Sequence, residues 1–171
     1  EEAVLARITQ AMPMANALTS RLEVVALERL VARGLVMISG VTPSDASHVL
    51  GGLGDWDGLA AEKALQLLAR RRTGAGERFA PGSQPLARMI VDQLTAQTVD
   101  CLLEAALAED PILAGEDPFA LSSHALTTAA LSRHKGLMQM TARLSVPVVG
   151  LGASAPFYYG AVGKRLDCEM I

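Results

Sequence analysis

The chain has little cysteine, few aromatic residues and no long hydrophobic run. Of its 171 residues, 2 are cysteine and 4% are aromatic. Cys101 and Cys168 match the spacing of neither a zinc site nor a disulfide framework, so we expect two ordinary buried thiols. No apolar run approaches the roughly 18 residues of a membrane-spanning helix, and the first residues lack the pattern of a signal peptide. We therefore expect a soluble, cytoplasmic protein without a membrane partner.

The chain also lacks an excess of positive charge. Its 15 Lys and Arg residues stand against 18 Asp and Glu residues, for a formal net charge of −3. The one dense basic run, residues 70–72, falls where a helix C-terminus favours cations. Nucleic acid is therefore not an expected partner. Because 50% of the residues are hydrophobic, we expect one domain with a substantial core over residues 1–171.

Helical spacing of apolar residues covers most of the chain. Capping, glycine and charge signals predict helices at residues 16–33, 43–50, 55–72, 83–108, 122–133 and 157–166, and Ser83 is expected to cap the fourth of them. The second of these has the clearest start. Thr42 is a capping residue, Pro43 suits the first helical position, and Asp45 completes a capping box.

Four short apolar or alternating runs predict strands, at residues 35–39, 137–144, 146–151 and 168–171. We therefore expect an α/β, helix-rich fold. Its sheet-containing core is formed by residues 34–51 and 136–171, and residues 55–109 form a helical insertion. The last predicted strand has no turn or helix after it, so we expect a fragment of a larger two-lobe protein.

A glycine turn near residue 150 is the most informative segment. An apolar run leads into Gly150 and Gly152, and a helical pattern follows. A strand that breaks into glycines and continues as a helix presents backbone N–H groups at the helix N-terminus, where an anionic or nucleotide ligand is stabilised. The candidate cofactor-binding residues are Gly150, Gly152, Ala153 and Ser154. The alternative is that these glycines only permit tight packing.

Asp45 and His48 are the catalytic candidates. They share a helix face at i and i+3, and a histidine oriented by a carboxylate serves as a base or a metal ligand. The capping role also explains Asp45, however, and one histidine without a second ligand is a poor metal site. No metal site is predicted from these residues.

Two segments resemble the hydantoinase A/oxoprolinase family. The first is Thr42-Pro43-Ser44-Asp45-Ala46-Ser47-His48-Val49-Leu50-Gly51, with the following Trp56-Asp57 and Ala60-Ala61. The second is Pro147-Val148-Val149-Gly150-Leu151-Gly152-Ala153-Ser154-Ala155, with Lys164-Arg165-Leu166 behind it, and it is similar to the late glycine motif of the family. The matches span the chain from about Thr42 to Ile171.

The resemblance implies a two-lobed actin-like, ribonuclease H-like ATPase, of which this chain is the later part. It also implies ATP with Mg as cofactor and cyclic amides such as hydantoins and 5-oxoproline as substrates, with the glycine turn on the adenosine side. The family's early Asp-x-Gly-Gly-Thr-like phosphate segment is absent from these residues. We therefore expect an ATP-dependent amidohydrolase as the parent and no activity from this chain alone. The implied partners are the missing N-terminal lobe of the same polypeptide and a second hydantoinase-type subunit; self-association is expected through an exposed apolar face.

Two other functions stay open. The turn also satisfies the Gly-x-Gly-x-x-Gly/Ala dinucleotide fingerprint, although Pro156 follows it directly and the expected acidic residue falls near Glu169 or beyond. The second alternative is a non-catalytic helical interaction module, in which every motif serves packing. Thermal stabilisation by ATP or by NAD distinguishes these functions.

Overall fold

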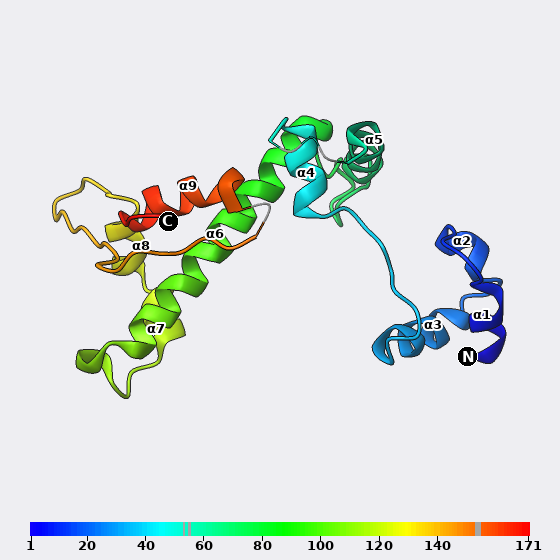
Figure 1. Cartoon of the computed structure of the whole chain (residues 1–171), viewed down its shortest axis with the longest axis horizontal. Coiled ribbons are helices and arrows are strands. Elements are labelled where there is room, and N and C mark those ends of the chain that lie inside the picture. Colours follow the sequence, from blue (N-terminus) through cyan, green and yellow to red (C-terminus); the bar gives the residue numbers. More distant parts are fainter. Residues whose placement is uncertain (53, 55, 153–154) are drawn as a thin grey trace. The chain divides into compact units, whose positions relative to one another are not determined.

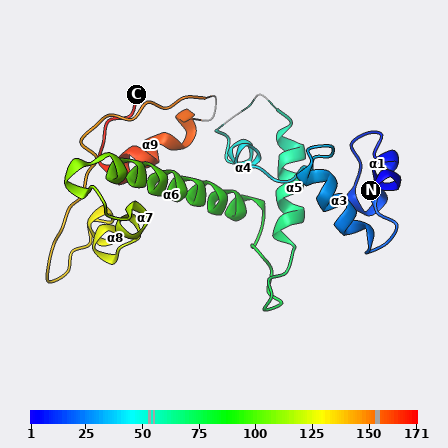
Figure 2. The ribbon, with the colours of Figure 1, turned by 90° about the horizontal axis from the view of Figure 1, so that it is seen from below.

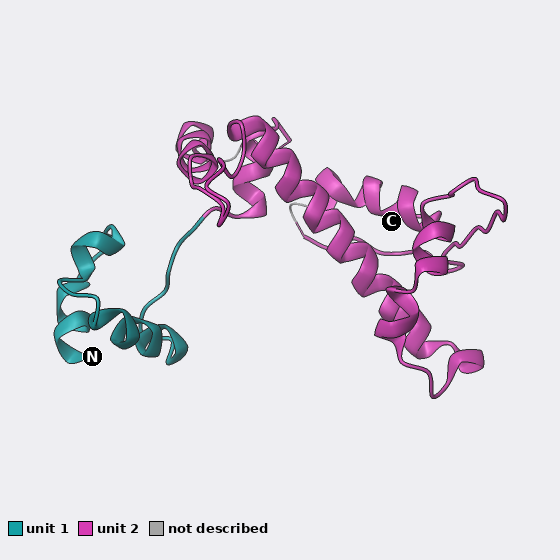
Figure 3. Cartoon of the chain, turned by 180° about the vertical axis from the view of Figure 1, so that it is seen from behind, with its two compact units in different colours: residues 1–40 teal, residues 41–171 magenta. Residues whose placement is uncertain are grey.

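The computed structural model describes residues 1–52, 54, 56–152 and 155–171, and these are mainly helical (Figure 1). The helices are α1 (Glu2–Arg7), α2 (Met14–Ala17), α3 (Glu23–Ala32), α4 (Pro43–Val49), α5 (Gly58–Ala69), α6 (Ser83–Glu109), the 3₁₀ helix η1 (Pro111–Leu113), α7 (Pro118–Ser122), α8 (Ala125–Leu131) and α9 (Ala155–Leu166). The chain divides into two compact units, unit 1 (Glu1–Gly40) and unit 2 (Val41–Ile171), shown separately coloured in Figure 3.

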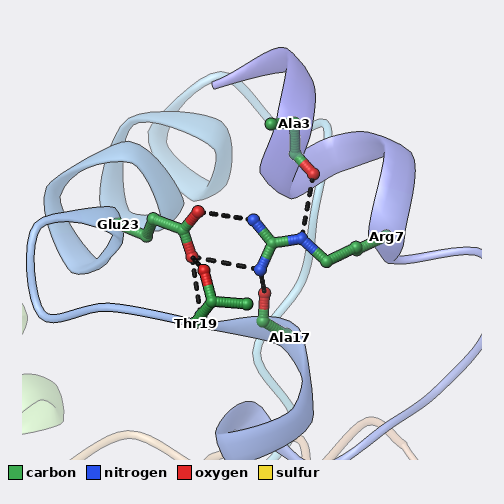
Figure 4. Close-up of polar contacts among 5 residues, drawn as sticks. All are labelled: Ala3, Arg7, Ala17, Thr19 and Glu23. Carbon is green, nitrogen blue, oxygen red and sulfur yellow. Dashed lines mark hydrogen bonds and ion pairs between the residues drawn. The ribbon is translucent and has the colours of Figure 1, made fainter.

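Unit 1 packs α1 against α3 around a small core. Val4, Leu27 and Leu30 are buried together, and their apolar side chains supply the main stabilisation of so small a unit. An ion pair between Arg7 and Glu23 joins α1 to α3 beside this core (Figure 4).

Unit 2 is arranged along the 27-residue helix α6. The first half of α6 packs with α4 and α5 through a core that includes Ala46, Leu65 and Leu86. The second half packs with α9 through Val99 and Leu166. Figures 1 and 2 both show α9 lying beside α6. The two ends of the long helix therefore carry separate apolar cores.

The start of α4 follows directly from its sequence. The Asp45 backbone N–H donates to Thr42 Oγ1 at 3.3 Å, and the Thr42 backbone N–H donates to Asp45 Oδ2 at 2.7 Å. Pro43 occupies the first turn, where its missing N–H is not needed. The predicted capping box is thus confirmed.

The predicted α/β fold is wrong, and so is the ribonuclease H-like lobe. Within the described residues the only β-pairing consists of three isolated bridges, Arg72 with Arg78, Lys135 with Gln139, and Val148 with Met170. Residues 35–39, 137–144, 146–151 and 168–171 do not form a sheet. A strand requires a neighbouring strand to bond its backbone, and none of the three bridges of the described residues involves residues 35–39.

The expectation for the cysteines is wrong for Cys101, which is exposed on α6. Cys168 is partly buried, and burial together with the nearby Asp167 charge raises the pKa of its thiol. This shift keeps Cys168 protonated and disfavours its reaction as a thiolate. Among the helices that the structure describes, none combines the length and apolar character needed to cross a bilayer.

Candidate functional site

The glycine turn begins at an extended segment that is tied to the end of the chain. The Val148 N–H donates to Glu169 O at 2.9 Å, and the Ile171 N–H donates back to Val148 O at 2.9 Å. The Gly150 N–H donates to Ile171 O at 2.8 Å. Val148 and Met170 are bridged in parallel. These bonds hold the backbone of residues 148–150 in place immediately before the turn.

The turn itself contains a backbone conformation that suits glycine. Gly152 has φ +114°. Its carbonyl accepts a hydrogen bond of 3.1 Å from the N–H of Ala155, which is the first residue of α9. L-residues rarely adopt this φ. Ala153 and Ser154, also predicted to bind cofactor, lie outside the described residues. Within the described part of the chain, the N–H groups of Leu151 and Gly152 donate no backbone hydrogen bond and remain possible donors to a ligand.

Aromatic side chains of α9 lie against this turn. A Cβ on Gly150 would be 3.4 Å from the Tyr159 ring, so the ring packs beside the backbone of Gly150. The Tyr158 and Tyr159 rings are stacked with centroids 4.9 Å apart. Burial raises the pKa of Tyr158, which keeps its hydroxyl neutral. The sequence gives no periodic signal for this contact, so Tyr159 was not a predicted site residue.

A close contact joins the residues just after α4 to the start of α9 in unit 2. Gly52, just after α4, lies so close to α9 that a Cβ there would come within 1.9 Å of the Phe157 ring. The residues after α4 therefore contact the first turn of α9, about a hundred positions further along the chain. The absence of a side chain at Gly52 permits this approach.

Asp45 and His48 take different roles. Asp45 Oδ2 accepts hydrogen bonds of 2.7 Å from both the N–H and the Oγ1 of Thr42, so the carboxylate serves the cap. His48 lies against Trp56 instead, with ring centroids 5.7 Å apart and planes inclined by 30°. Of the two predicted catalytic residues, Asp45 therefore contacts Thr42 at the start of α4, whereas His48 contacts Trp56.

His48 and Trp56 line an open hollow of about 490 Å³ between the end of α4 and the start of α5. Glu62 and Gln84 also line it. The Gln84 side-chain amide donates to Val49 O at 3.3 Å and so ties the start of α6 to the end of α4. The hollow is polar and open, and its carboxylates oppose the binding of an anion.

The described residues contain no group of three or more His, Cys, Asp or Glu side chains placed to hold a metal ion. No protein-family model, curated protein or solved structure matches this chain.

Proposed function

We propose that this chain is part of an ATP-dependent cyclic-amide hydrolase of the hydantoinase/oxoprolinase kind, and that its glycine turn contacts the adenosine of the nucleotide. The observation that carries the proposal is the turn at Gly150 and Gly152, held between a hydrogen-bonded extended segment and the start of α9. The proposal rests on the sequence resemblance for the reaction and on the turn for the ligand.

Three features of the turn support a nucleotide as its ligand. Gly152 leaves open space where a Cβ would stand. The backbone N–H groups of the turn and the positive end of α9 favour polar and anionic groups. Leu151 is 83% exposed and offers an apolar surface to a base.

The proposal limits what this chain does alone. The described residues include no cluster of three or more His, Cys, Asp or Glu side chains placed to hold a metal ion, and we assign no catalytic step to the metal. When bound with ATP in the parent enzyme, Mg²⁺ neutralises phosphate charge. The chain's own residues bind and orient the adenosine, while hydrolysis requires groups from partners: the N-terminal lobe and a second hydantoinase-type subunit. We place the protein in the cytoplasm, where free thiols such as Cys101 and Cys168 stay reduced.

Ligand-induced thermal stabilisation tests the proposal. We expect adenosine and ATP to raise the melting temperature of the chain by mass action, and Gly152→Asp to abolish the shift because its side chain fills the turn. Gly115→Asp is the matched control, since Gly115 also has a positive φ, +95°, and open space around its Cβ position. It should retain the full shift.

Three results contradict the proposal. Equal binding by Gly152→Asp removes the turn from the site. Stabilisation by NAD but not by adenosine or ATP indicates a dinucleotide-binding protein. No shift with any of the three indicates an interaction module.

A further inference from the structure

A second cavity lies in unit 2, between the end of α5 and the start of α6. It has a volume of about 280 Å³, and the residues that line it include Gln66, Arg70, Arg78, Gly82 and Ser83. Figure 2 shows the connection that leaves α5 and returns to the start of α6. Among the described residues, no aspartate or glutamate lines this cavity, in contrast to the hollow beside Trp56.

Ser83 is the most informative residue of the cavity. It is only 8% exposed, yet its hydroxyl forms no hydrogen bond within the described residues. No fully buried side-chain oxygen or nitrogen of the described residues lacks a partner. The Ser83 hydroxyl must therefore retain contact with the cavity that Ser83 lines. The hydroxyl is therefore free to bond to water or to a ligand in the cavity.

The backbone at the same point also has unused donors. Gly82 precedes the 27 residues of α6 and contributes no side-chain cap. The first backbone N–H groups of a helix have no acceptor within the helix. In α6 these are the N–H groups of Ser83 and Gln84, since Pro85 has no N–H. The positive end of the helix dipole therefore faces the cavity without a capping group.

Two guanidinium groups complete the cavity. Arg70 and Arg78 both line it, and neither forms an ion pair with another described residue. The loop that carries Arg78 is held to α5 by the bridge between Arg72 and Arg78 and by a 3.2 Å hydrogen bond from the Ala80 N–H to Ala69 O. The arginine backbone positions are therefore defined by the fold.

We propose that this cavity binds a phosphate group. The Ser83 hydroxyl and the first amides of α6 donate to its oxygens, and Arg70 and Arg78 balance its charge, because guanidinium groups match phosphate geometry and bind it strongly. The inference goes beyond the proposed function, since it involves neither the glycine turn nor an adenosine.

Isothermal titration of the full chain with inorganic phosphate tests the proposal. We expect saturable binding at one site, and Arg70→Gln and Arg78→Gln should each weaken it about tenfold, as expected for loss of a charge-assisted hydrogen bond. Ser83→Ala should weaken it severalfold. Arg71→Gln is the matched control, because Arg71 neighbours Arg70 but does not line the cavity. Gly152→Asp should also leave phosphate binding unchanged.

The source of the phosphate is distinguished by a second titration with ribose 5-phosphate. Binding of both probes assigns the site to phosphomonoesters, whereas binding of inorganic phosphate alone assigns it to the free ion. Absence of saturable phosphate binding overturns the proposal. The proposal is also overturned if Arg70→Gln and Arg78→Gln bind phosphate as tightly as the unchanged protein, whatever the result for Ser83→Ala. The melting temperatures of the two arginine variants show whether they are folded.

Discussion

Arg7 and Glu23 form the most extensive polar contact of unit 1 (Figure 4). The Arg7 guanidinium donates to Glu23 Oε2 at 3.0 Å and to Ala17 O at 2.8 Å. Glu23 also accepts a 2.7 Å hydrogen bond from the Thr19 N–H. Hydrogen bonding to Arg7, followed by that to Thr19, lowers the pKa of Glu23 from its ordinary 4.5 to about 2.

This pKa shift predicts how the stability of unit 1 depends on pH. Because the folded state holds Glu23 ionised, its contribution is complete above pH 4.5 and is lost as the pH falls toward 2. We expect Glu23→Gln to speed hydrogen exchange at the buried Leu27 and Leu30 amides at pH 7 and to remove part of the acid sensitivity between pH 4.5 and 2.

Glu28→Gln is the control for this prediction, since Glu28 is an exposed residue of α3 without an ion pair among the described residues. It should exchange like the unchanged protein at both pH values. An equal effect of the two substitutions would show that the Arg7 contact is not responsible.

At the scale of elements, the contact between the end of α4 and the first turn of α9 depends on a single glycine. A Cβ at Gly52 would overlap the Phe157 ring, so Gly52→Ala should destabilise unit 2 by about 1–3 kcal/mol, the cost of overpacking. Chemical denaturation followed by Trp56 fluorescence measures this change.

A second substitution separates the clash from other effects of Gly52→Ala. Phe157→Leu makes room for the added methyl group, and the double variant should recover much of the stability lost in Gly52→Ala alone. Additive losses in the double variant would mean that the two residues do not meet.

The helices could be predicted where the sequence contains capping residues that mark their ends. The capping box at Thr42 located α4. The prediction that Ser83 caps the long helix was wrong, because Gly82 is the N-cap of α6 and Ser83 is its first residue. The predicted helix 16–33 was wrong in its first part, because α2 ends at Ala17 and α3 starts only at Glu23, whose carboxylate binds Thr19. The predicted helix 55–72 begins, as α5, at Gly58 after Asp57 caps it; Asp55 lies outside the described residues.

Strands and the candidate site were less predictable, because both depend on contacts between distant residues. Apolar runs such as 35–39 satisfy the pattern of a buried strand, but the pattern does not reveal whether a neighbouring strand exists. The glycine turn was located from Gly150 and Gly152, whereas its packing against Tyr159 was not. The burial of Ser83 beside a cavity has no sequence signature, since it depends on residues that the fold brings together.

At the scale of the whole molecule, many large apolar side chains are exposed. Leu137 and Met138 follow one another in an irregular segment, with Val146 and Val149 further along it, and all four are more than half exposed. Exposed apolar surface of this extent favours association. We expect light scattering after gel filtration to give at least twice the mass of one chain.

Replacing two of these residues tests the surface responsible. Leu137→Ser with Met138→Ser should shift the protein toward the monomer. Ile112→Ser is the control, because Ile112 is 91% exposed but lies in the separate 3₁₀ helix η1. A monomer at high concentration in the unchanged protein would contradict the prediction.

The long helix α6 places a constraint on insertions and deletions. Its contacts at Ala87 and Val99 belong to different apolar cores, about 18 Å apart along the axis at about 1.5 Å per residue. Adding or removing one residue between them would rotate one core relative to the other by about 100°. The middle of α6 is therefore expected to tolerate changes of side chain far better than any change of length.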